Sequence, residues 1–392
     1  RPTSPDAAIN LQRLEHRGAP VLAWWQGRIE NGRGYGSYVL ADEAYREIRR
    51  INAGDGLQAD LHELVLTDAG TALLIAYRKQ PTAAGASAKL PPQIYDSLVQ
   101  EIDLDSGRVL FEWSAAQRIG LDESYEPLPD NGDAWDYCHV NSIDVDADGS
   151  LIVSARNTSA VYKVDRSSGE VIWRLGGRRS DFTLGSGAGF ALQHDARRHA
   201  DGSLSIFDDS QAPGLSRGIR LRLDESSMRA SLLGEYVNPR RFTTPAQGNM
   251  QLLDDGHALI GWGSEPYLSE FGTDASLLLD IGFPSGDASY RVFRSTWTGR
   301  PTEPPALVVE ADAGATNAYV SWNGATEVRC WELLGGASAS SLGPLARAAR
   351  TGFETRVALR GVPPAFVVAR ALDGSGGELG RSTVVATAQA PA

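Results

Sequence analysis

The alternation of apolar runs and turn residues is most regular over residues 138–177. Its apolar runs are 140–145, 151–154, 160–164 and 171–175, separated by turn signals at 146–149, 156–159 and 166–169. Short runs rich in Val, Ile and Tyr, bounded by Gly, Asn, Asp and Ser, predict antiparallel strands joined by hairpins. Four such strands within about 40 residues are typical of one β-propeller blade.

The same pattern recurs along residues 60–282 with a period of about 50 residues. His62, His139 and His194 occupy equivalent places at the start of three successive repeats, and Gln247 takes that place in the next. Strand-like runs at 21–25, 37–41 and 47–52 precede them, and one at 290–293 follows. Residues 1–18 show no such pattern and are expected to lie along the surface. We therefore predict an all-β chain that contains a β-propeller. The propeller would have six four-stranded blades and would be closed by the pairing of N- and C-terminal strands. The alternative to this closed propeller is that part of its N-terminal region is missing from the chain.

A proline-rich segment at 301–305 divides the chain, because proline interrupts strand pairing and stiffens linkers. We predict a propeller domain over residues 1–300 and a second domain over 301–392. Strand-like runs in the second part are 306–310, 317–322, 329–334, 353–359, 365–372 and 382–386. Their spacing, with a central Trp322, predicts a fibronectin-III or Ig-like sandwich.

Composition narrows the classes of partner. The formal net charge is −12, with 49 acidic and 37 basic residues, which disfavours a nucleic-acid partner. No apolar run approaches 18 residues, so no membrane span is predicted. The two cysteines, Cys138 and Cys330, are too few for a disulfide framework and are expected to be buried thiols. The first residue is Arg1 and not methionine, so we expect a processed chain. The oligomeric state is not predicted.

The positions of the histidines are the main chemical signal. The first strand of each propeller blade lines the central channel, so equivalent positions on neighbouring blades converge. His62, His139 and His194 would then meet in one funnel. A single histidine in a turn is more often structural, and the alignment of three favours a functional site.

Other polar and aromatic residues could contribute to that site. Arg156 ends the second strand of its blade, where a guanidinium facing inward would suit an oxyanion. Asn141 and Asn157 could orient an imidazole or a ligand oxygen, although Asn157 in a hairpin also has a backbone explanation. Trp262 could form an aromatic wall, as could Trp24, Trp25 and Trp135, and each could equally belong to the core. Asp195 follows His194 directly, points to the opposite strand face, and is not expected to be its partner.

Several catalytic signatures are absent from the sequence. It contains no G-x-x-x-x-G-K-[ST] loop, so no nucleotide cradle is recognisable. It also lacks a G-x-S-x-G elbow and an H-E-x-x-H motif. We therefore expect no nucleotide cofactor.

Several motifs together resemble the arylsulfotransferase family of β-propellers, in its fungal and actinobacterial branch. They are DLHE at 60–63, HVNSI at 139–143, SARNTS at 154–159, WRLGG at 173–177 and QHDAR at 193–197, with QGN at 247–249 and GWG at 261–263. The resemblance covers residues 24–283. It implies a sulfuryl transfer from an aryl sulfate to a phenol, through a sulfohistidine and without a nucleotide. It also implies small aromatic substrates and a secreted or extracytoplasmic location.

Carried over by motif, His194 would be the nucleophile. His139 and Arg156 would bind the sulfuryl oxygens, and His62 would complete the pocket and exchange protons with the phenols. Gln247 stands where a fourth histidine would fit the repeat, and the C-terminal domain has no counterpart in periplasmic members of the family.

Three alternatives remain open at this point. One is a metal-dependent hydrolase or lyase in which His62, His139 and His194 hold a divalent ion. Another is a propeller enzyme with a different reaction, such as cyclisation of an aromatic or secondary-metabolite substrate. The last is a secreted binding module without turnover.

Overall fold

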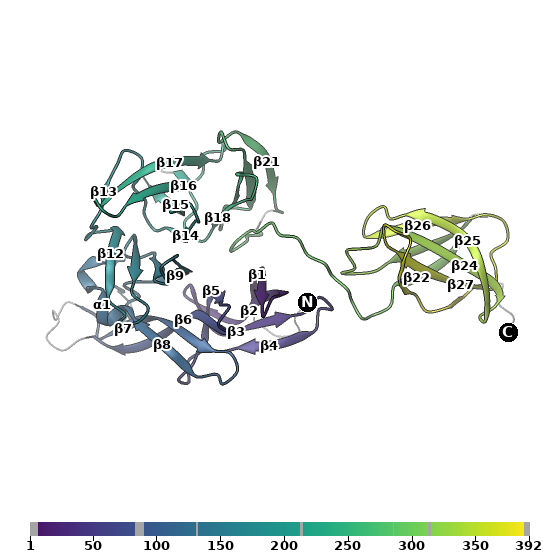
Figure 1. Cartoon of the computed structure of the whole chain (residues 1–392), viewed down its shortest axis with the longest axis horizontal. Coiled ribbons are helices and arrows are strands. Elements are labelled where there is room, and N and C mark those ends of the chain that lie inside the picture. Colours follow the sequence, from purple (N-terminus) through teal and green to yellow (C-terminus); the bar gives the residue numbers. More distant parts are fainter. Residues whose placement is uncertain are drawn as a thin grey trace. The chain divides into compact units, whose positions relative to one another are not determined.

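The computed structural model describes residues 7–82, 90–130, 132–211, 215–284, 286–312 and 315–387. They form two compact units, one of Arg1–Leu40 with Arg49–Ser295 and one of Ala41–Ile48 with Thr296–Ala392 (Figure 1). In the described residues the helices are the short α1 (Ala115–Arg118) and the 3₁₀ turn η1 (Leu121–Glu123). None of the helices there is long and apolar enough to cross a membrane. The all-β prediction is confirmed.

The first unit consists of successive antiparallel meanders. Its strands are β1 (Ala7–His16), β2 (Ala19–Glu30), β3 (Arg33–Ala41), β4 (Glu47–Ile51), β5 (Ala59–Leu66), β6 (Thr71–Pro81), β7 (Gln93–Asp103), β8 (Val109–Ser114), β9 (Val140–Val145), β10 (Leu151–Ala155), β11 (Ala160–Val164), β12 (Val171–Gly176), β13 (Thr183–Leu184), β14 (His194–Arg198), β15 (Ser203–Gln211), β16 (Leu215–Asp224), β17 (Arg229–Val237), β18 (Asn249–Leu252), β19 (Ala258–Gly261), β20 (Tyr267–Phe271) and β21 (Leu277–Gly282). β1–β8 share one sheet, while β9–β12, β13–β17 and β18–β21 form separate sheets.

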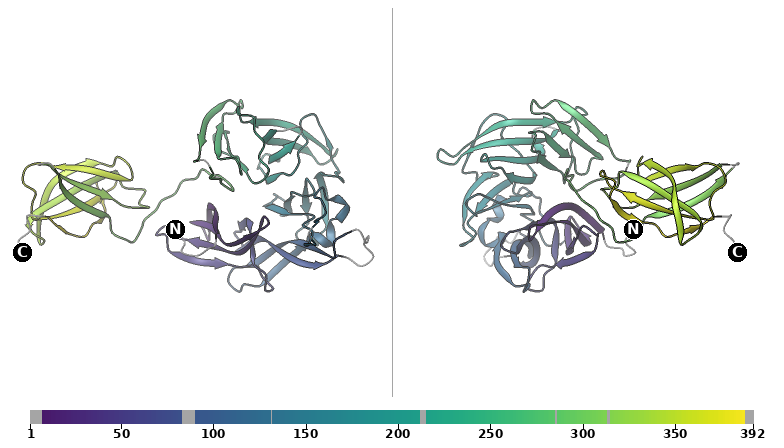
Figure 2. Two further views of the ribbon diagram at one scale, coloured as in Figure 1. Left: turned by 180° about the vertical axis from the view of Figure 1, so that it is seen from behind. Right: turned by 45° about the vertical axis from the view of Figure 1, so that its right-hand side comes forward.

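The sheets of this unit stand around a common centre, as propeller blades do (Figures 1 and 2). β9 contacts both β5 and β14, and β14 contacts β18. The first strands of successive meanders therefore lie next to one another at the centre. After β21 the next strand of the described chain belongs to the second unit, so the prediction of six blades is not confirmed.

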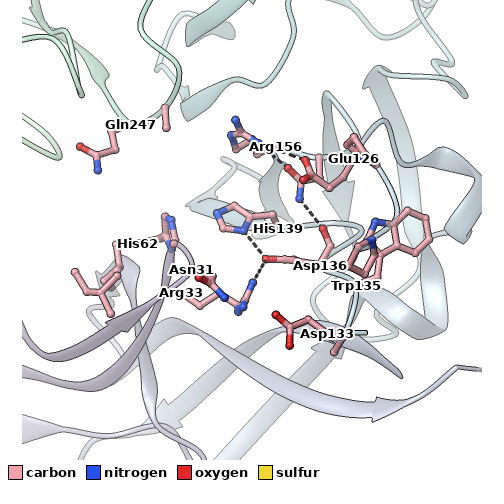
Figure 3. Close-up of a pocket in the computed structure, with 18 of the residues that line it drawn as sticks. Asn31, Arg33, His62, Glu126, Asp133, Trp135, Asp136, His139, Arg156 and Gln247 are labelled. Atoms are coloured by element: carbon pink, nitrogen blue, oxygen red, sulfur yellow. Dashed lines mark hydrogen bonds and ion pairs between the residues drawn. The ribbon is translucent and has the colours of Figure 1, made fainter. Parts of the chain in front are cut away.

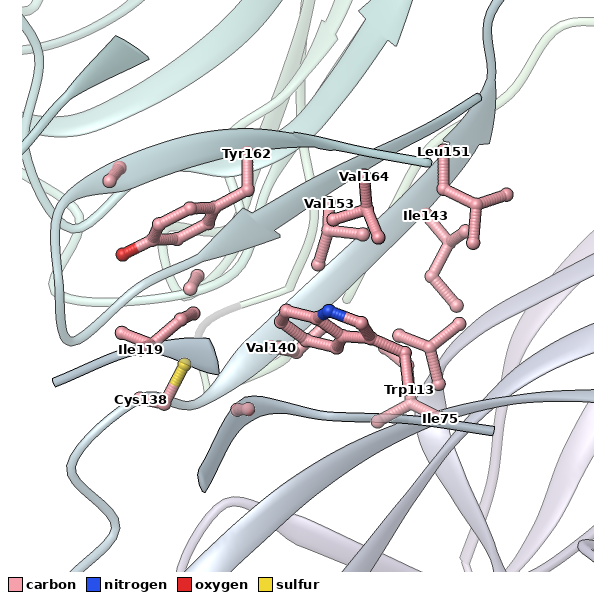
Figure 4. Packing of buried hydrophobic residues seen from close by; sticks show 14 of the residues in the cluster. Ile75, Trp113, Ile119, Cys138, Val140, Ile143, Leu151, Val153, Tyr162 and Val164 are labelled. Atoms are coloured by element: carbon pink, nitrogen blue, oxygen red, sulfur yellow. The ribbon is translucent and has the colours of Figure 1, made fainter. Parts of the chain in front are cut away.

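Apolar side chains between neighbouring sheets form the core. Trp113 of β8 and Ile75 of β6 pack against Val140, Val153 and Tyr162 of the next sheet (Figure 4). These side chains are almost fully buried. The alternating runs of the sequence thus provide one apolar face to each neighbour.

The N-terminal residues differ from expectation. Residues 7–16 form β1, which pairs antiparallel with β2, so the prediction of a segment without strand pattern was wrong there, although most of its residues are exposed or half-buried. The register shifts between Ile9 and Gln12, and Leu11 is 60% exposed. This irregularity breaks the period-2 alternation that would have marked a strand.

Residues 290–294, which we call the strap, were predicted to include a strand and do not form one. The strap instead lies along β18, where side chains replace strand pairing. The Asn249 amide bonds both the N–H and the C=O of Val292 at 2.8 Å, and Gln251 does the same for Arg294 at 2.9 and 2.8 Å. Gly261 permits this approach, because a Cβ there would lie 2.6 Å from the Asn249 Oδ1.

An ion pair joins the strap to the blade of β5. Arg291, whose side chain is 0% exposed, lies 3.1 Å from a carboxylate oxygen of Glu63 and 3.4 Å from Asp195. Arg197 also contacts both carboxylates. The strap therefore ties blades that are distant in the sequence to one another at the centre of the unit.

The second unit contains two antiparallel sheets. Its strands are β22 (Ala306–Asp312), β23 (Ala315–Ser321), β24 (Cys330–Ser338), β25 (Ser341–Ala349), β26 (Glu354–Leu359), β27 (Phe366–Leu372), β28 (Glu378–Arg381) and β29 (Val385–Ala386). One sheet has the order β22-β23-β26 and the other β25-β24-β27-β28, with β29 on β27. Trp331 and Leu333 belong to its buried core. The fibronectin-III type of this unit stays a prediction.

The cysteines are both free thiols. Cys138 is buried, as expected, and burial raises the pKa of its thiol. Cys330 is only half-buried and accepts a hydrogen bond from Arg347 at 3.0 Å, so the prediction of burial was wrong for this residue.

Candidate active site

A cavity of about 720 Å³ opens at the centre of the first unit (Figure 3). Its walls come from β5 and the starts of β9 and β14, the hairpin between β2 and β3, and Tyr290 of the strap. Residues 126–130 and 133–136 and the segments that follow β10 and precede β18 complete the lining. Six predicted site residues line it, namely His62, His139, Arg156, Asn157, His194 and Gln247. The convergence of three imidazoles is therefore present in the structure.

Each of the three imidazoles is held by a carboxylate at its Nδ1. The pairs are His62 with Asp60, His139 with Asp136 at 2.7 Å, and His194 with Asp209 at 2.7 Å. A carboxylate at Nδ1 fixes the ring orientation and favours the proton on that nitrogen. The Nε2 atoms are then the nitrogens available for chemistry.

His194 is the most buried of the three, at 2% exposure. Burial lowers the pKa of His194 well below its usual value, and the nearby Arg156 lowers it further. Burial also raises the pKa of Asp209, an effect that Arg156 opposes. The backbone N–H of Gln247 donates to the His194 Nε2 at 3.4 Å. The imidazole is therefore neutral, with its Nε2 lone pair directed away from Asp209.

His62 and His139 meet edge to face, with ring centroids 5.0 Å apart at 87°. Their exposures are 4% and 9%, and no described residue donates to or accepts from either Nε2. Burial lowers the pKa of His62, although Asp60 opposes that effect. The ring of Tyr290 packs edge-on against His62 at 5.5 Å. Two imidazole nitrogens of the cavity lining are thus left for a ligand.

The carboxylate behind His139 is itself held by a cation. Arg33 donates to the Asp136 Oδ2 at 2.9 Å, and its guanidinium lies 3.8 Å from the centre of the Tyr95 ring. Burial would raise the pKa of Asp136, but His139 and Arg33 outweigh it and the pKa lies below the usual value. The ionised Asp136 can therefore orient His139.

Arg156 lies on the cavity wall, with its side chain 21% exposed. It donates to the Asn157 Oδ1 at 2.9 Å and to the Pro245 carbonyl at 3.0 Å. Glu126 lies 3.9 Å from the guanidinium. Asn157 in turn donates to the backbone carbonyl of Asp136 at 2.6 Å. The two residues form a rigid polar edge beside His139 and His194.

Two predicted binding residues do not line the cavity. Asn141 is 0% exposed and donates to the Gln193 carbonyl at 2.7 Å, so it joins β9 to the start of β14. Trp262 is also 0% exposed, packs among Phe207, Phe242 and Phe271, and donates to Ser269. Both are structural residues. Of the other tryptophans considered, Trp135 lines the cavity, whereas Trp25 is core.

Sequence reasoning missed the three carboxylates. Asp60 lies two residues before His62 and Asp136 three before His139, a proximity that the sequence offered as a signal. Asp209 is fifteen residues from His194, across a hairpin, and no local pattern marks it. The expectation that Asp195 does not pair with His194 agrees with the geometry, because Asp195 contacts Arg197 and Arg291.

One cluster of possible metal ligands lies among the described residues. Asp255, His257 and Glu270 form a group whose ligand atoms lie within 4.8 Å of one another. Arg294 already contacts both carboxylate oxygens of Glu270. The cavity histidines do not form such a group within the described chain.

The fold and site together define an all-β protein with a histidine-lined central cavity. A family model described as arylsulfotransferase (ASST) matches residues 12–283. The chain belongs to the arylsulfotransferase family. None of the curated proteins matches it significantly.

Several solved structures match the chain at low sequence identity. A protein of unknown function from Bacteroides caccae is 12% identical, with 84% of this chain and 97% of that chain covered and a TM-score of 0.37. A streptogramin B lyase is 11% identical, with 96% and 91% covered and a TM-score of 0.39. Virginiamycin B lyase from Staphylococcus aureus is 11% identical, with 71% and 89% covered and a TM-score of 0.35.

Proposed function

We propose that the chain transfers a sulfuryl group from an aryl sulfate to a phenol, with His194 as the nucleophile. The observation that carries the proposal is the neutral His194, whose Nδ1 is bound by Asp209 and whose Nε2 lies in a cavity beside Arg156. Family membership supports the same general chemistry. The proposed reaction uses no nucleotide and no metal.

In the first half-reaction the Nε2 of His194 releases the long hydrogen bond that it accepts from the Gln247 N–H and attacks the sulfur of the aryl sulfate. An N–S bond forms, the bond from sulfur to the aryl oxygen breaks, and a phenolate leaves with the electron pair. A neutral imidazole suits this step, since it is both a nucleophile and a good leaving group. The ring gains positive charge as the bond forms, and Asp209 at 2.7 Å from Nδ1 compensates it.

In the second half-reaction an acceptor phenol loses its proton to the Nε2 of His62. The phenol oxygen attacks sulfur, the N–S bond breaks, and its electron pair returns to His194. Burial lowers the pKa of His62, so the ring is neutral and can accept this proton. The protonated His62 then supplies the proton to the next leaving phenolate, which restores the starting state.

Arg156 and His139 are the proposed ligands of the sulfuryl oxygens. Negative charge on those oxygens is best stabilised by donors that are already fixed in position. Arg156 is fixed by Asn157 and the Pro245 carbonyl, and His139 by Asp136. Gln247 contributes its backbone N–H beside the nucleophile.

The test uses p-nitrophenyl sulfate as donor and phenol as acceptor. We expect nitrophenol release that depends on phenol, and a sulfuryl adduct in the intact mass after donor alone. His194→Ala should abolish both. His199→Ala is the matched control, because His199 follows the same strand, bonds Ser205 at 2.8 Å and does not line the cavity.

An adduct that persists in His194→Ala would place the nucleophile elsewhere and overturn the assignment. Absence of release and adduct with several aryl sulfates would overturn the transferase proposal itself.

A further inference from the structure

Asn10 lies at the irregular point of strand β1. The register of β1 with β2 shifts between Ile9 and Gln12, and Asn10 has a φ of 58°. Asparagine is one of the few residues besides glycine that adopt this left-handed conformation readily. Asn10 is 6% exposed, whereas Leu11 beside it is 60% exposed. The irregularity thus buries a polar side chain in a strand whose Ile9 lines the cavity, and such breaks often redirect a side chain next to a functional site.

The Asn10 amide binds the segment of β5 that carries His62. Its Nδ2 donates to the backbone carbonyl of Leu61 at 3.1 Å and to that of His62 at 3.3 Å. Leu61 and His62 both line the cavity and are each 4% exposed. An amide nitrogen carries two hydrogens, so each carbonyl can accept one of them. Since a buried carbonyl without a partner is costly, these two bonds fix the backbone of His62 against β1.

Side chains hold this part of β5 where its strand pairing is irregular. The register of β5 with β6 shifts within residues 59–64. The N–H of His62 donates to the Asp60 Oδ1 at 2.9 Å, and the Tyr290 hydroxyl donates to the His62 carbonyl at 3.4 Å. Asn10 therefore belongs to a small set of side chains that determine where the backbone of His62 lies.

We propose that Asn10 is a positioning residue for His62, which it holds in place for proton exchange with the phenols through the two backbone carbonyls. The proposal rests on the proposed function for the role of His62, while the contacts of Asn10 are independent of it. A displacement of about 1 Å at a reacting group can cost about 100-fold in rate. Loss of the amide should therefore affect the step in which His62 accepts a proton.

The test variant is Asn10→Gly, because glycine retains the left-handed backbone and removes the amide. Intact mass after p-nitrophenyl sulfate alone measures adduct formation on His194. This rate should not change, since nitrophenolate is a weak base and leaves without a proton from His62. Decay of the adduct in the presence of phenol should slow by about 10- to 100-fold. A general loss of structure would instead slow both half-reactions.

Leu11→Gly is the matched control, because it makes the same change at the neighbouring, exposed position of β1. It should leave both rates unchanged. Adduct decay as fast in Asn10→Gly as in the parent protein, or an equal slowing in Leu11→Gly, would overturn the proposal while leaving the transferase proposal intact.

Asn10→Asp separates hydrogen-bond donation from packing. Aspartate has nearly the same shape and also tolerates the left-handed backbone, but at pH 8 it presents carboxylate oxygens to the two carbonyls. Adduct decay should therefore be slower in Asn10→Asp than in Asn10→Gly. The reverse order would show that the side chain only fills space and would overturn the proposal. Urea unfolding establishes that each variant is folded, and if Asn10→Asp is not, the two glycine variants carry the test.

If the parent protein forms no adduct with any aryl sulfate, the transferase proposal fails and NMR decides the positioning role. The ring signal of His62 is identified by its loss in His62→Gln. Burial lowers the pKa of His62, and in Asn10→Gly we expect this pKa to move toward about 6.5, because a displaced imidazole is less buried. An unchanged titration in Asn10→Gly, or the same change in Leu11→Gly, would overturn the proposal.

Discussion

The Nδ1 of His194 lies 2.7 Å from the Oδ2 of Asp209, a residue on the neighbouring strand β15 that is itself 0% exposed. The same relation recurs at His62 with Asp60 and at His139 with Asp136. Three blades therefore supply not only an imidazole each but also the carboxylate that orients it.

Asp209→Asn should slow formation of the sulfuryl adduct by about 10²- to 10⁴-fold. An amide at Nδ1 can donate rather than accept, which moves the imidazole proton to Nε2 and blocks the nucleophile. Adduct formation in single turnover, followed by intact mass, measures this directly. Asp208→Asn is the control, because Asp208 is also buried but bonds Arg217 at 2.9 Å. An unchanged adduct rate in Asp209→Asn would show that Asp209 does not act on His194.

His62 should make folding sensitive to mild acid. Burial holds the pKa of His62 below the value of 6.5 that applies in the unfolded chain. The unfolded state therefore binds more protons, and the free energy of unfolding falls as the pH drops below about 6.5, by at most ~1.4 kcal/mol per pH unit. It stops falling below the folded pKa. Urea unfolding of His62→Gln from pH 7.5 to 5 should show a shallower decline, and an identical slope would contradict the prediction.

His62 is a clearer subject for this test than His194. The pKa of Asp209 is raised by burial, so its contribution to stability is lost as pH rises. That contribution has the opposite sign to the contribution of His194 and partly cancels it.

Removal of Arg291 should destabilise the first unit strongly. Arg291→Met leaves the buried Glu63 and Asp195 without one of their cations, which costs about 3–5 kcal/mol. Arg294→Met is the control on the same strap, since the Arg294 side chain is 47% exposed and solvent screens its pair with Glu270, so this variant should lose little stability. Urea unfolding measures both. Equal losses in the two variants would refute the role of the buried ion pair.

Trp262→Phe should affect stability and not substrate affinity. The variant loses the hydrogen bond from Nε1 to Ser269 at 2.8 Å, which costs about 1–3 kcal/mol if Ser269 loses a partner. KM for the donor should stay constant. Trp135→Phe, on the cavity wall, should change KM instead. A several-fold change of KM in Trp262→Phe would restore Trp262 to the binding site.

Much of the fold follows from local sequence signals. The strands predicted between residues 138 and 177 agree with β9–β12 to within about one residue, because Asp- and Gly-rich turns interrupt clear apolar runs. Gly149, for example, has a φ of 85° and closes the turn between β9 and β10 by bonding the Asp146 carbonyl. β25 was missed, since its exposed Gly343 and Pro344 interrupt any apolar run.

The site was predictable to the extent that it repeats. His62, His139 and His194 share a place in each meander, so the repeat alone brought them together. Asp209 and Asn249 act across strands, and that pairing register was not determined from sequence. The repeat could also mislead, as Trp262 shows. A tryptophan at a repeat position is equally compatible with the wall of a binding site and with the core. The substrates, the number of blades and an extracytoplasmic location stay predictions.

The strap has a consequence for the order in which the protein is built. Synthesis proceeds from the N-terminus, so β5 and Glu63 emerge long before Arg291. The meanders can pair internally as they appear, since their strands are neighbours in sequence. Glu63 and Asp195, by contrast, can pair with Arg291 only after the end of the first unit has been synthesised. A nascent chain that stalls on the ribosome before residue 291 would therefore have its meanders paired but would lack the Arg291 ion pairs at the centre of the unit.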